Sequence, residues 1–167
     1  MLNRGALLHD IGKIGISAKI LDKPARLTDE EFSLIKEHPT KGFRIIEPIA
    51  AYKDVLPIIL QHHERIDGKG YPQGLEGHKI SMEAKIVAVA DAFDAIVSDR
   101  PYRKGMSQPQ AIEIMREEAG QQFDPSALEA LIEVFKEGES SSGATSIEHP
   151  MEIKAVSGEG RISDARR

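Results

Sequence analysis

The chain has 167 residues, of which 40% are hydrophobic and 29% charged, so it can form one ordinary globular core and no more than one full domain. It contains no cysteine, which excludes disulfides and thiolate metal sites and leaves imidazole and carboxylate as candidate metal ligands. A formal net charge of -5 argues against binding of long nucleic acid, which needs a broad basic surface, whereas a small anionic nucleotide can still bind a local patch.

The first chemical feature along the chain is an adjacent histidine and aspartate. His9 and Asp10 follow an apolar stretch, where an unpaired charge would be costly. They are either a core histidine bonded to its neighbour or part of a metal site. Adjacent residues on one helix point about 100° apart, so both can reach a site only near a helix end or by binding different metals, which suits a bridging Asp10.

Three short helices are predicted between residues 28 and 63. Thr28 and Glu31 form a capping box that opens a helix through residue 37, and His38 lies at its exit. A second helix is expected from residue 39 or 40 to 47. A third is expected over 54–63, where apolar residues and His62 share a face. Residues 65–79 contain four glycines and a proline, which predicts a loop.

The second half of the chain is expected to contain the central helix. Ser81 caps a predicted helix that runs to about residue 97, and its apolar residues extend nearly around it, which indicates a buried element. Helices follow over 109–119 and 125–136, the latter opened by Asp124. Residues 139–167 lack periodicity, and their composition predicts a disordered tail. We therefore predict an all-α fold with a single helical-bundle domain over residues 1–138.

A second group of candidate ligands lies on the third and the central helix. His62 could be a core imidazole and His63 a polar residue at a helix end, but Asp91, buried among apolar residues, needs a cation or several donors. Asp94, one turn later, is either a partner of a metal ligand or a surface carboxylate. With the His-Asp pair, these side chains indicate a metal site, because imidazoles and carboxylates hold first-row divalent cations and leave positions open for water.

The order of these motifs resembles the HD-GYP family of metal-dependent phosphodiesterases, part of the HD superfamily. The resemblance rests on the adjacent His-Asp, a His-Pro at His38, the run His62-His63-Glu64 and the Gly-Tyr-Pro loop that starts at Gly70, and it covers roughly residues 1–137. It implies an HD-type helical domain that hydrolyses cyclic di-GMP to pGpG or onward to GMP. Two divalent metal ions, or three in some members, are implied as cofactors, with iron or manganese expected.

The resemblance also implies roles for individual residues. The metal ligands would be His9, Asp10, His38, His62, His63 and Asp91. Asp10 would bridge two ions, and Lys13 would lie beside the scissile phosphate, so these two are the catalytic candidates. The substrate would be bound by Lys13, Gly70, Tyr71, Arg100 and Arg103. For the three basic residues, a solvated surface position is the alternative. The glycine loop alone could be a plain turn, in which Gly68 and Gly70 allow positive φ or close backbone approach.

One part of the family pattern has no counterpart ahead of the His-Asp pair. Family members carry preceding helices that supply a further histidine ligand and, in three-metal members, a glutamate. Here Met1 stands eight residues ahead of His9. We therefore expect a domain without those helices, in which activity is weakened.

The sequence leaves three functions open. The leading hypothesis is a cyclic di-GMP phosphodiesterase. The alternative is a catalytically impaired module that binds metal or nucleotide, or docks on diguanylate cyclases. A third, a nucleotidase or phosphatase of the HD superfamily, would lack the Gly-Tyr-Pro loop. The expected partners are a cyclic dinucleotide and either a diguanylate cyclase or a sensory or receiver domain. No signal sequence or spanning apolar run is visible, so we expect a cytoplasmic protein without a membrane span.

Overall fold

The computed structural model of the protein describes residues 1–99 and 104–141. Within these ranges the backbone forms helices and two isolated β-bridges but no strand, which confirms the all-α prediction. The α-helices are α1 (Leu2–Leu8), α2 (Ala18–Leu21), α3 (Asp29–Ile35), α4 (His38–Ile46), α5 (Leu56–Gln61), α6 (Met82–Val97), α7 (Gln108–Glu117) and α8 (Pro125–Ser141). Three 3-10 helices lie between them: η1 (Ile11–Gly15), η2 (Ala50–Val55) and η3 (Gly77–Lys79).

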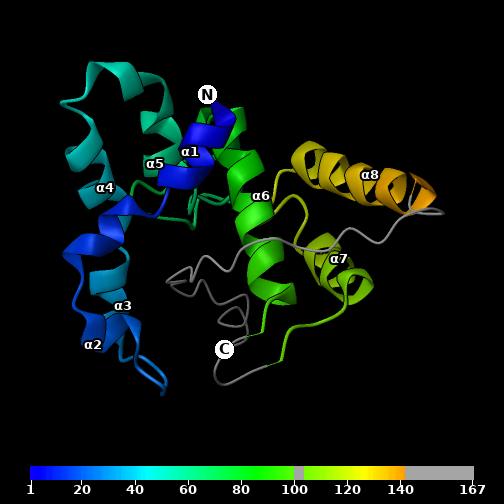
Figure 1. Ribbon diagram of the computed structural model, residues 1–167, viewed down its shortest axis with the longest axis horizontal. Coiled ribbons are helices and arrows are strands. Elements are labelled where there is room, and N and C mark those ends of the chain that lie inside the picture. Colours follow the sequence, from blue (N-terminus) through cyan, green and yellow to red (C-terminus); the bar gives the residue numbers. More distant parts are fainter. Residues whose placement is uncertain (100–103, 142–167) are drawn as a thin grey trace.

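Helix α6 runs through the middle of the molecule, with α1 to α5 on one side and α7 and α8 on the other (Figure 1). The apolar core has two parts accordingly. The larger part joins α6, α7 and α8 through the buried residues Val89, Phe93, Ile96, Ala111, Met115, Phe123, Ala127, Leu128 and Ile132. The smaller part joins α4, η2 and α5 through Ile46, Val55 and Ile59. Because α5 also packs against α1 and α6, the ends of several helices meet between the two parts.

Helix starts that carry a capping signal lie where the sequence predicts them. Thr28 and Glu31 form both bonds of the capping box: the amide of Glu31 donates to Thr28 Oγ1 at 3.2 Å, and the amide of Thr28 donates to Glu31 Oε2 at 2.8 Å. Ser81 Oγ accepts from the amide of Ala84 at 3.2 Å and opens α6. These side chains satisfy amides that have no partner within the helix.

Other boundaries differ from the prediction. The third predicted helix was expected over 54–63, but α5 spans Leu56–Gln61 and follows the 3-10 helix Ala50–Val55. Pro57 explains the change, because it lacks an N–H and therefore belongs in the first turn of an α-helix rather than after it. The prediction that α6 is buried nearly all round was also wrong, since Ala90 and Asp94 are exposed on one side.

Helix α8 begins at the predicted place and ends later than predicted. Asp124 Oδ1 accepts from the amides of Ser126 at 3.0 Å and Ala127 at 3.3 Å, and its Oδ2 lies 3.0 Å from Lys85 Nζ. Burial alone would raise the pKa of Asp124, but the hydrogen bonds from Ser126 and Lys85 lower it to about 2. The helix continues to Ser141 rather than ending at residue 136. Residues 142–167 of the predicted tail lie outside the described residues.

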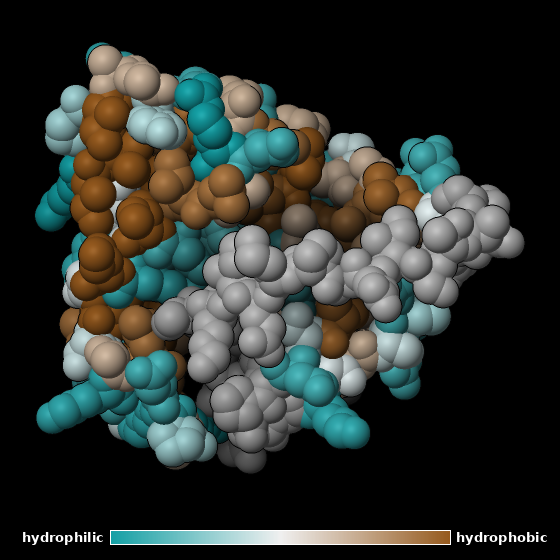
Figure 2. All heavy atoms as spheres, viewed as in Figure 1, coloured by the Kyte–Doolittle hydropathy of each residue, from teal (hydrophilic) through white to brown (hydrophobic). Residues whose placement is uncertain are grey.

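Large exposed apolar side chains occur on several helices, including Leu7 on α1, Ile45 on α4 and Val134 on α8. In the orientation of Figure 1, apolar residues are most continuous along the left edge, where α4 lies (Figure 2). Leu34, Ile45 and Ile49 are among the large apolar residues that are more than a third exposed. None of the helices in the described part combines the length and the apolar character that crossing a bilayer requires.

Candidate metal centre

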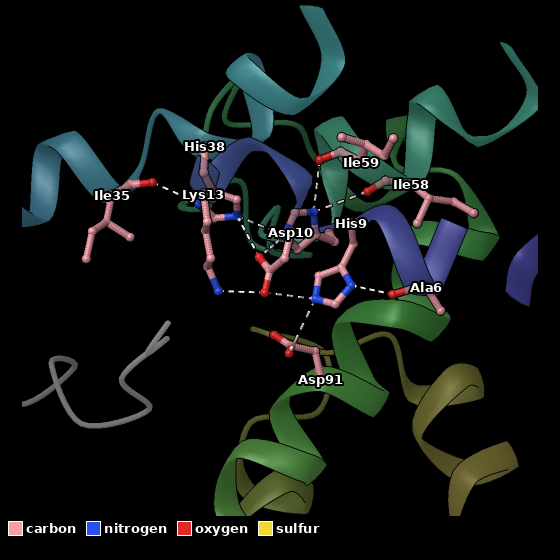
Figure 3. Close-up of polar contacts among 10 residues, drawn as sticks. Ala6, His9, Asp10, Lys13, Ile35, His38, Ile58, Ile59 and Asp91 are labelled. Carbon is pink, nitrogen blue, oxygen red and sulfur yellow. Dashed lines mark hydrogen bonds and ion pairs between the residues drawn. The ribbon is translucent and has the colours of Figure 1, made fainter. Parts of the chain in front are cut away.

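His9 and Asp10 lie at a break between two helices. His9 is the C-terminal cap of α1, and Asp10 is the residue before η1. The chain turns between them, so two adjacent side chains reach the same cluster (Figure 3). This is the arrangement that the sequence requires if both residues serve one site.

Three histidines are held by the same kind of hydrogen bond. Nδ1 of His9 lies 2.6 Å from the carbonyl oxygen of Ala6, Nδ1 of His38 lies 2.8 Å from that of Ile35, and Nδ1 of His62 lies 2.9 Å from that of Ile59. A carbonyl oxygen only accepts, so each Nδ1–H donates. In the neutral form of each ring, Nε2 then carries a lone pair, and metal-binding histidines are commonly oriented this way.

The Nε2 atoms converge on one carboxylate. Nε2 of His38 and Nε2 of His62 lie 3.1 Å apart, and Oδ1 of Asp10 lies 3.2 Å from the first and 3.9 Å from the second. One ligand atom from each of Asp10, His38, His62 and His63 lies within 4.8 Å of the others. His38 and His62 are fully buried. Burial, together with the neighbouring His9 and His38, lowers the pKa of His62 to about 3.

These four residues fit a divalent cation. Neutral imidazoles and a carboxylate bring lone pairs and negative charge to one buried point, which is costly without a positive partner. Oδ1 of Asp10 and Nε2 of His9 are buried and have no hydrogen-bond partner among the described residues. The donor set is all nitrogen and oxygen, as first-row divalent metals accept. The cluster is therefore a possible metal site, in agreement with the motif analysis.

The second oxygen of Asp10 faces a different set of groups. Oδ2 lies 3.3 Å from Nε2 of His9 and 2.5 Å from Nζ of Lys13, and Nε2 of His9 lies 3.7 Å from Oδ1 of Asp91 (Figure 3). Burial would raise the pKa of Asp10, but the neighbouring rings of His38 and His9 and the charge of Lys13 hold it well below its ordinary value. Burial opposes protonation of His9, but Asp10 and Asp91 raise its pKa to about 10.

Lys13 belongs to the cluster. Its side chain is only 9% exposed and its ammonium group is paired with Asp10. The alternative that Lys13 is a solvated surface residue is therefore wrong. Its predicted contact with a substrate phosphate stays a prediction.

His63 and Tyr71 form a stacked pair at the edge of the cluster. Their ring centroids lie 4.8 Å apart with an interplanar angle of 25°. The ring of His63 also meets the ring of His38 at 4.9 Å and that of His62 at 4.1 Å. Tyr71 was predicted to bind the substrate, which stays a prediction; in the structure its ring contacts a candidate metal ligand.

The remaining candidates have different outcomes. Asp91 lies on α6 with Oδ1 3.7 Å from Nε2 of His9, and its predicted role as a metal ligand stays a prediction. Asp94 is exposed and accepts a hydrogen bond from Ser98 Oγ at 3.1 Å, on its own helix, so its predicted role as a partner of a ligand stays a prediction. Arg100 and Arg103 lie outside the described residues.

Glu64 holds the glycine-rich loop in place, a role that the motif analysis did not assign. The side chain is buried, and its two oxygens accept from the amides of Gln73 at 2.7 Å and Leu75 at 2.8 Å. Gly70 fits because the loop passes close to this part of the backbone: a Cβ on Gly70 would overlap the amide nitrogen of Arg65 and lie 2.5 Å from Cα of Glu64. The sequence signal that could have revealed this contact is a glutamate directly before a glycine-rich loop, because a carboxylate can accept hydrogen bonds from backbone amides of the loop.

We expect Glu64→Gln to loosen the loop. A glutamine offers one acceptor oxygen and an amide group that cannot accept, so either Gln73 or Leu75 loses its partner, at a cost of about 1–3 kcal/mol. Hydrogen exchange at these two amides should become faster. Glu76→Gln is the matched control, because Glu76 lies in the same loop with an exposed side chain. Unchanged exchange in Glu64→Gln would contradict this account.

The chain matches a family model described as HD domain over residues 2–127. It is 47% identical over 129 residues to a cyclic di-GMP phosphodiesterase of Pseudomonas aeruginosa, covering 75% of this chain and 30% of the relative. It is 46% identical over 136 residues to a cyclic di-GMP phosphodiesterase of Thermotoga maritima, covering 79% and 36%. It is 41% identical over 130 residues to a 3'3'-cGAMP-specific phosphodiesterase of Vibrio cholerae, covering 78% and 28%. The chain thus spans about a third of the length of these relatives.

A solved structure has a similar fold. The HDG"Y"P protein Bd1817 from Bdellovibrio bacteriovorus superposes with a TM-score of 0.63 at 28% identity, covering 81% of this chain and 43% of that protein. The helical fold is therefore shared with a solved relative.

Proposed function

The chain belongs to the HD domain family, in its HD-GYP branch, and from this membership and the geometry of the cluster we propose that it hydrolyses a phosphodiester bond of a cyclic dinucleotide with the help of divalent metal ions. The observation that carries the proposal is the convergence of Nε2 of His38, Nε2 of His62 and Oδ1 of Asp10 at one buried point. In an apolar core this arrangement would be unfavourable, because it places acceptor atoms against one another.

The two oxygens of Asp10 support two metal positions. Oδ1 faces the histidines of α4 and α5, and Oδ2 faces His9, which in turn faces Asp91. His38, His62 and His63 would hold one ion with Oδ1, and His9 and Asp91 would hold the second with Oδ2. Bound divalent ions would polarise the phosphodiester and lower the pKa of a water molecule. Iron and manganese are the metals we propose, because both accept mixed nitrogen and oxygen ligands.

The residues around the cluster suggest how the substrate is held. The ammonium group of Lys13 lies beside Asp10, so a phosphate bound there would meet a positive charge. The Gly-Tyr-Pro loop lies against the cluster through the stack of Tyr71 on His63. Arg100 and Arg103 remain proposed phosphate ligands. The names of the reported relatives specify cyclic di-GMP or 3'3'-cGAMP, and we propose a substrate of this class for this chain. The predicted docking on a diguanylate cyclase or a sensory or receiver domain, and the cytoplasmic location, stay predictions.

Turnover by the metal-loaded chain tests the proposal. The protein is loaded anaerobically with Fe(II) or Mn(II) and incubated with cyclic di-GMP, 3'3'-cGAMP and mononucleotides, and the products are separated by chromatography. We expect metal-dependent conversion of a cyclic dinucleotide to its linear form or to mononucleotides. Turnover of mononucleotides alone would point to the nucleotidase alternative. Bound metal without any turnover would favour the module that binds metal or nucleotide without hydrolysing it.

A further inference from the structure

His63 differs from the other histidines of the cluster in how its ring is held. His9, His38 and His62 each donate Nδ1–H to a backbone carbonyl three residues earlier. Neither ring nitrogen of His63 forms a hydrogen bond with another described residue. Its ring lies instead against the rings of Tyr71, His38 and His62.

Without such a hydrogen bond, the orientation of the His63 ring depends on the residues packed against it. Rotation about the bond between Cβ and the imidazole has broad minima, so a ring without a hydrogen bond is poorly fixed. A metal ligand must point a nitrogen lone pair at the ion, and other histidine ligands achieve this through a hydrogen bond at the second nitrogen. Some other contact must therefore orient His63.

The position of Tyr71 next to His63 is itself fixed by a backbone hydrogen bond and by a cation beside its ring. Its amide donates to the carbonyl oxygen of His63 at 3.1 Å, so the loop closes back onto the histidine that the ring covers. Nζ of Lys36 lies 5.6 Å from the centroid of the Tyr71 ring and 4.7 Å from that of Phe32, a distance at which a cation is attracted to an aromatic face.

We propose that Tyr71, steadied by Lys36, is a positioning residue that orients His63 for metal binding, so that the tyrosine of the Gly-Tyr-Pro loop sets metal affinity. The stack takes the place of the carbonyl that orients the other three histidines. The inference rests on the metal site of the proposed function and is independent of the substrate. Lys36 was not among the sequence candidates, because its contact with the loop bridges 35 positions of the chain.

Metal affinity of Tyr71 variants tests the inference. Binding of Mn(II) to the metal-free chain is measured by calorimetry without nucleotide. Tyr71→Leu removes the ring, and we expect affinity to fall by about 10-fold, at the lower end of the effect of losing a partner of a ligand. Tyr71→Phe keeps the ring and should restore affinity to within about twofold of the unsubstituted chain, because stacking needs only the ring. Tyr52→Leu is the matched control, since Tyr52 packs on the smaller apolar cluster and against Arg4.

A second readout separates positioning from general loosening. With Co(II) in place of Mn(II), the visible absorption of Tyr71→Leu should change in shape as one nitrogen ligand is lost, while that of Tyr71→Phe should not. Thermal unfolding in the presence of a chelator shows whether each variant is folded, and Tyr71→Met replaces Tyr71→Leu if the latter does not fold.

The possible outcomes separate this inference from the proposed function. Unchanged Mn(II) affinity in Tyr71→Leu, an equal loss in Tyr71→Phe, or an equal loss in Tyr52→Leu would overturn the inference. Tight Mn(II) binding that depends on the Tyr71 ring, without turnover of any nucleotide, would overturn only the proposed function. Absence of Mn(II) binding by the unsubstituted chain would overturn both.

Discussion

Replacing His62 with alanine is expected to remove metal binding and with it phosphodiester hydrolysis. The residue is only 2% exposed, and its Nε2 lies 3.1 Å from Nε2 of His38 and 3.9 Å from Oδ1 of Asp10. Losing a partner of a ligand typically weakens metal binding by about 10–100-fold, so losing the ligand itself should exceed about 100-fold.

The unfolding temperature gives a test that does not depend on turnover. Metal that binds only the folded chain stabilises it by about 2.7 kcal/mol when present at about 100 times its dissociation constant. We expect this gain with Mn(II) for the unsubstituted chain and none for His62→Ala. His78→Ala is the matched control, because His78 lies in η3 with a side chain that is 71% exposed. If His62→Ala keeps both the stabilisation and the turnover, the cluster is not the metal site.

Local signals in the sequence predict much of the helical framework. A capping box depends on residues three apart, so Thr28 and Glu31 locate the start of α3 without knowledge of any distant contact. The same holds for Ser81 and Asp124 at the starts of α6 and α8. The misplaced start of α5 also had a local signal, since Pro57 cannot donate within an α-helix.

The membership of the candidate site is also largely predictable, while its internal contacts are not. The order of the motifs identifies one group of candidate ligands, and the structure places these side chains together: His9, Asp10, His38, His62 and Asp91. That three histidines use Nδ1 in the same way cannot be predicted from composition, because it depends on local backbone geometry at three helix ends. The burial of Lys13 depends on the packing of η1 against α4, and the hydrogen bonds from Gln73 and Leu75 to Glu64 depend on how the glycine-rich loop folds back.

The partial exposure of α6 shows what the hydrophobic pattern of a sequence does not predict. Apolar residues nearly surround the helix in the sequence, yet Ala90 and Asp94 are exposed. Hydrophobic character tells which side chains can be buried, but burial needs a neighbouring element on each side. In the described residues, α5 and α1 cover one side of α6 and α7 and α8 another, which leaves this strip uncovered.

Gly12→Ala is expected to damage both the fold and the metal site. A Cβ on Gly12 would overlap the carbonyl oxygen of His38 and lie 2.5 Å from the amide nitrogen of Gly42, so η1 would have to move away from α4. Both obstacles are backbone atoms, which cannot rotate aside. Overpacking typically costs about 1–3 kcal/mol, and we expect the loss in free energy of unfolding to reach about 3 kcal/mol here.

The same movement should weaken metal binding, because η1 carries Lys13 and begins directly after Asp10. A shift of η1 would separate Oδ1 of Asp10 from Nε2 of His38, which now lie 3.2 Å apart. Urea unfolding with a chelator measures the first effect, and Mn(II) calorimetry on the folded variant measures the second. Gly15→Ala is the matched control on the same 3-10 helix: the atoms nearest to its Cβ would belong to the flexible side chain of Lys41, the first at 3.1 Å, so stability should change by less than about 1 kcal/mol. Equal effects of the two substitutions would mean that contact between η1 and α4 does not hold Asp10 in the site.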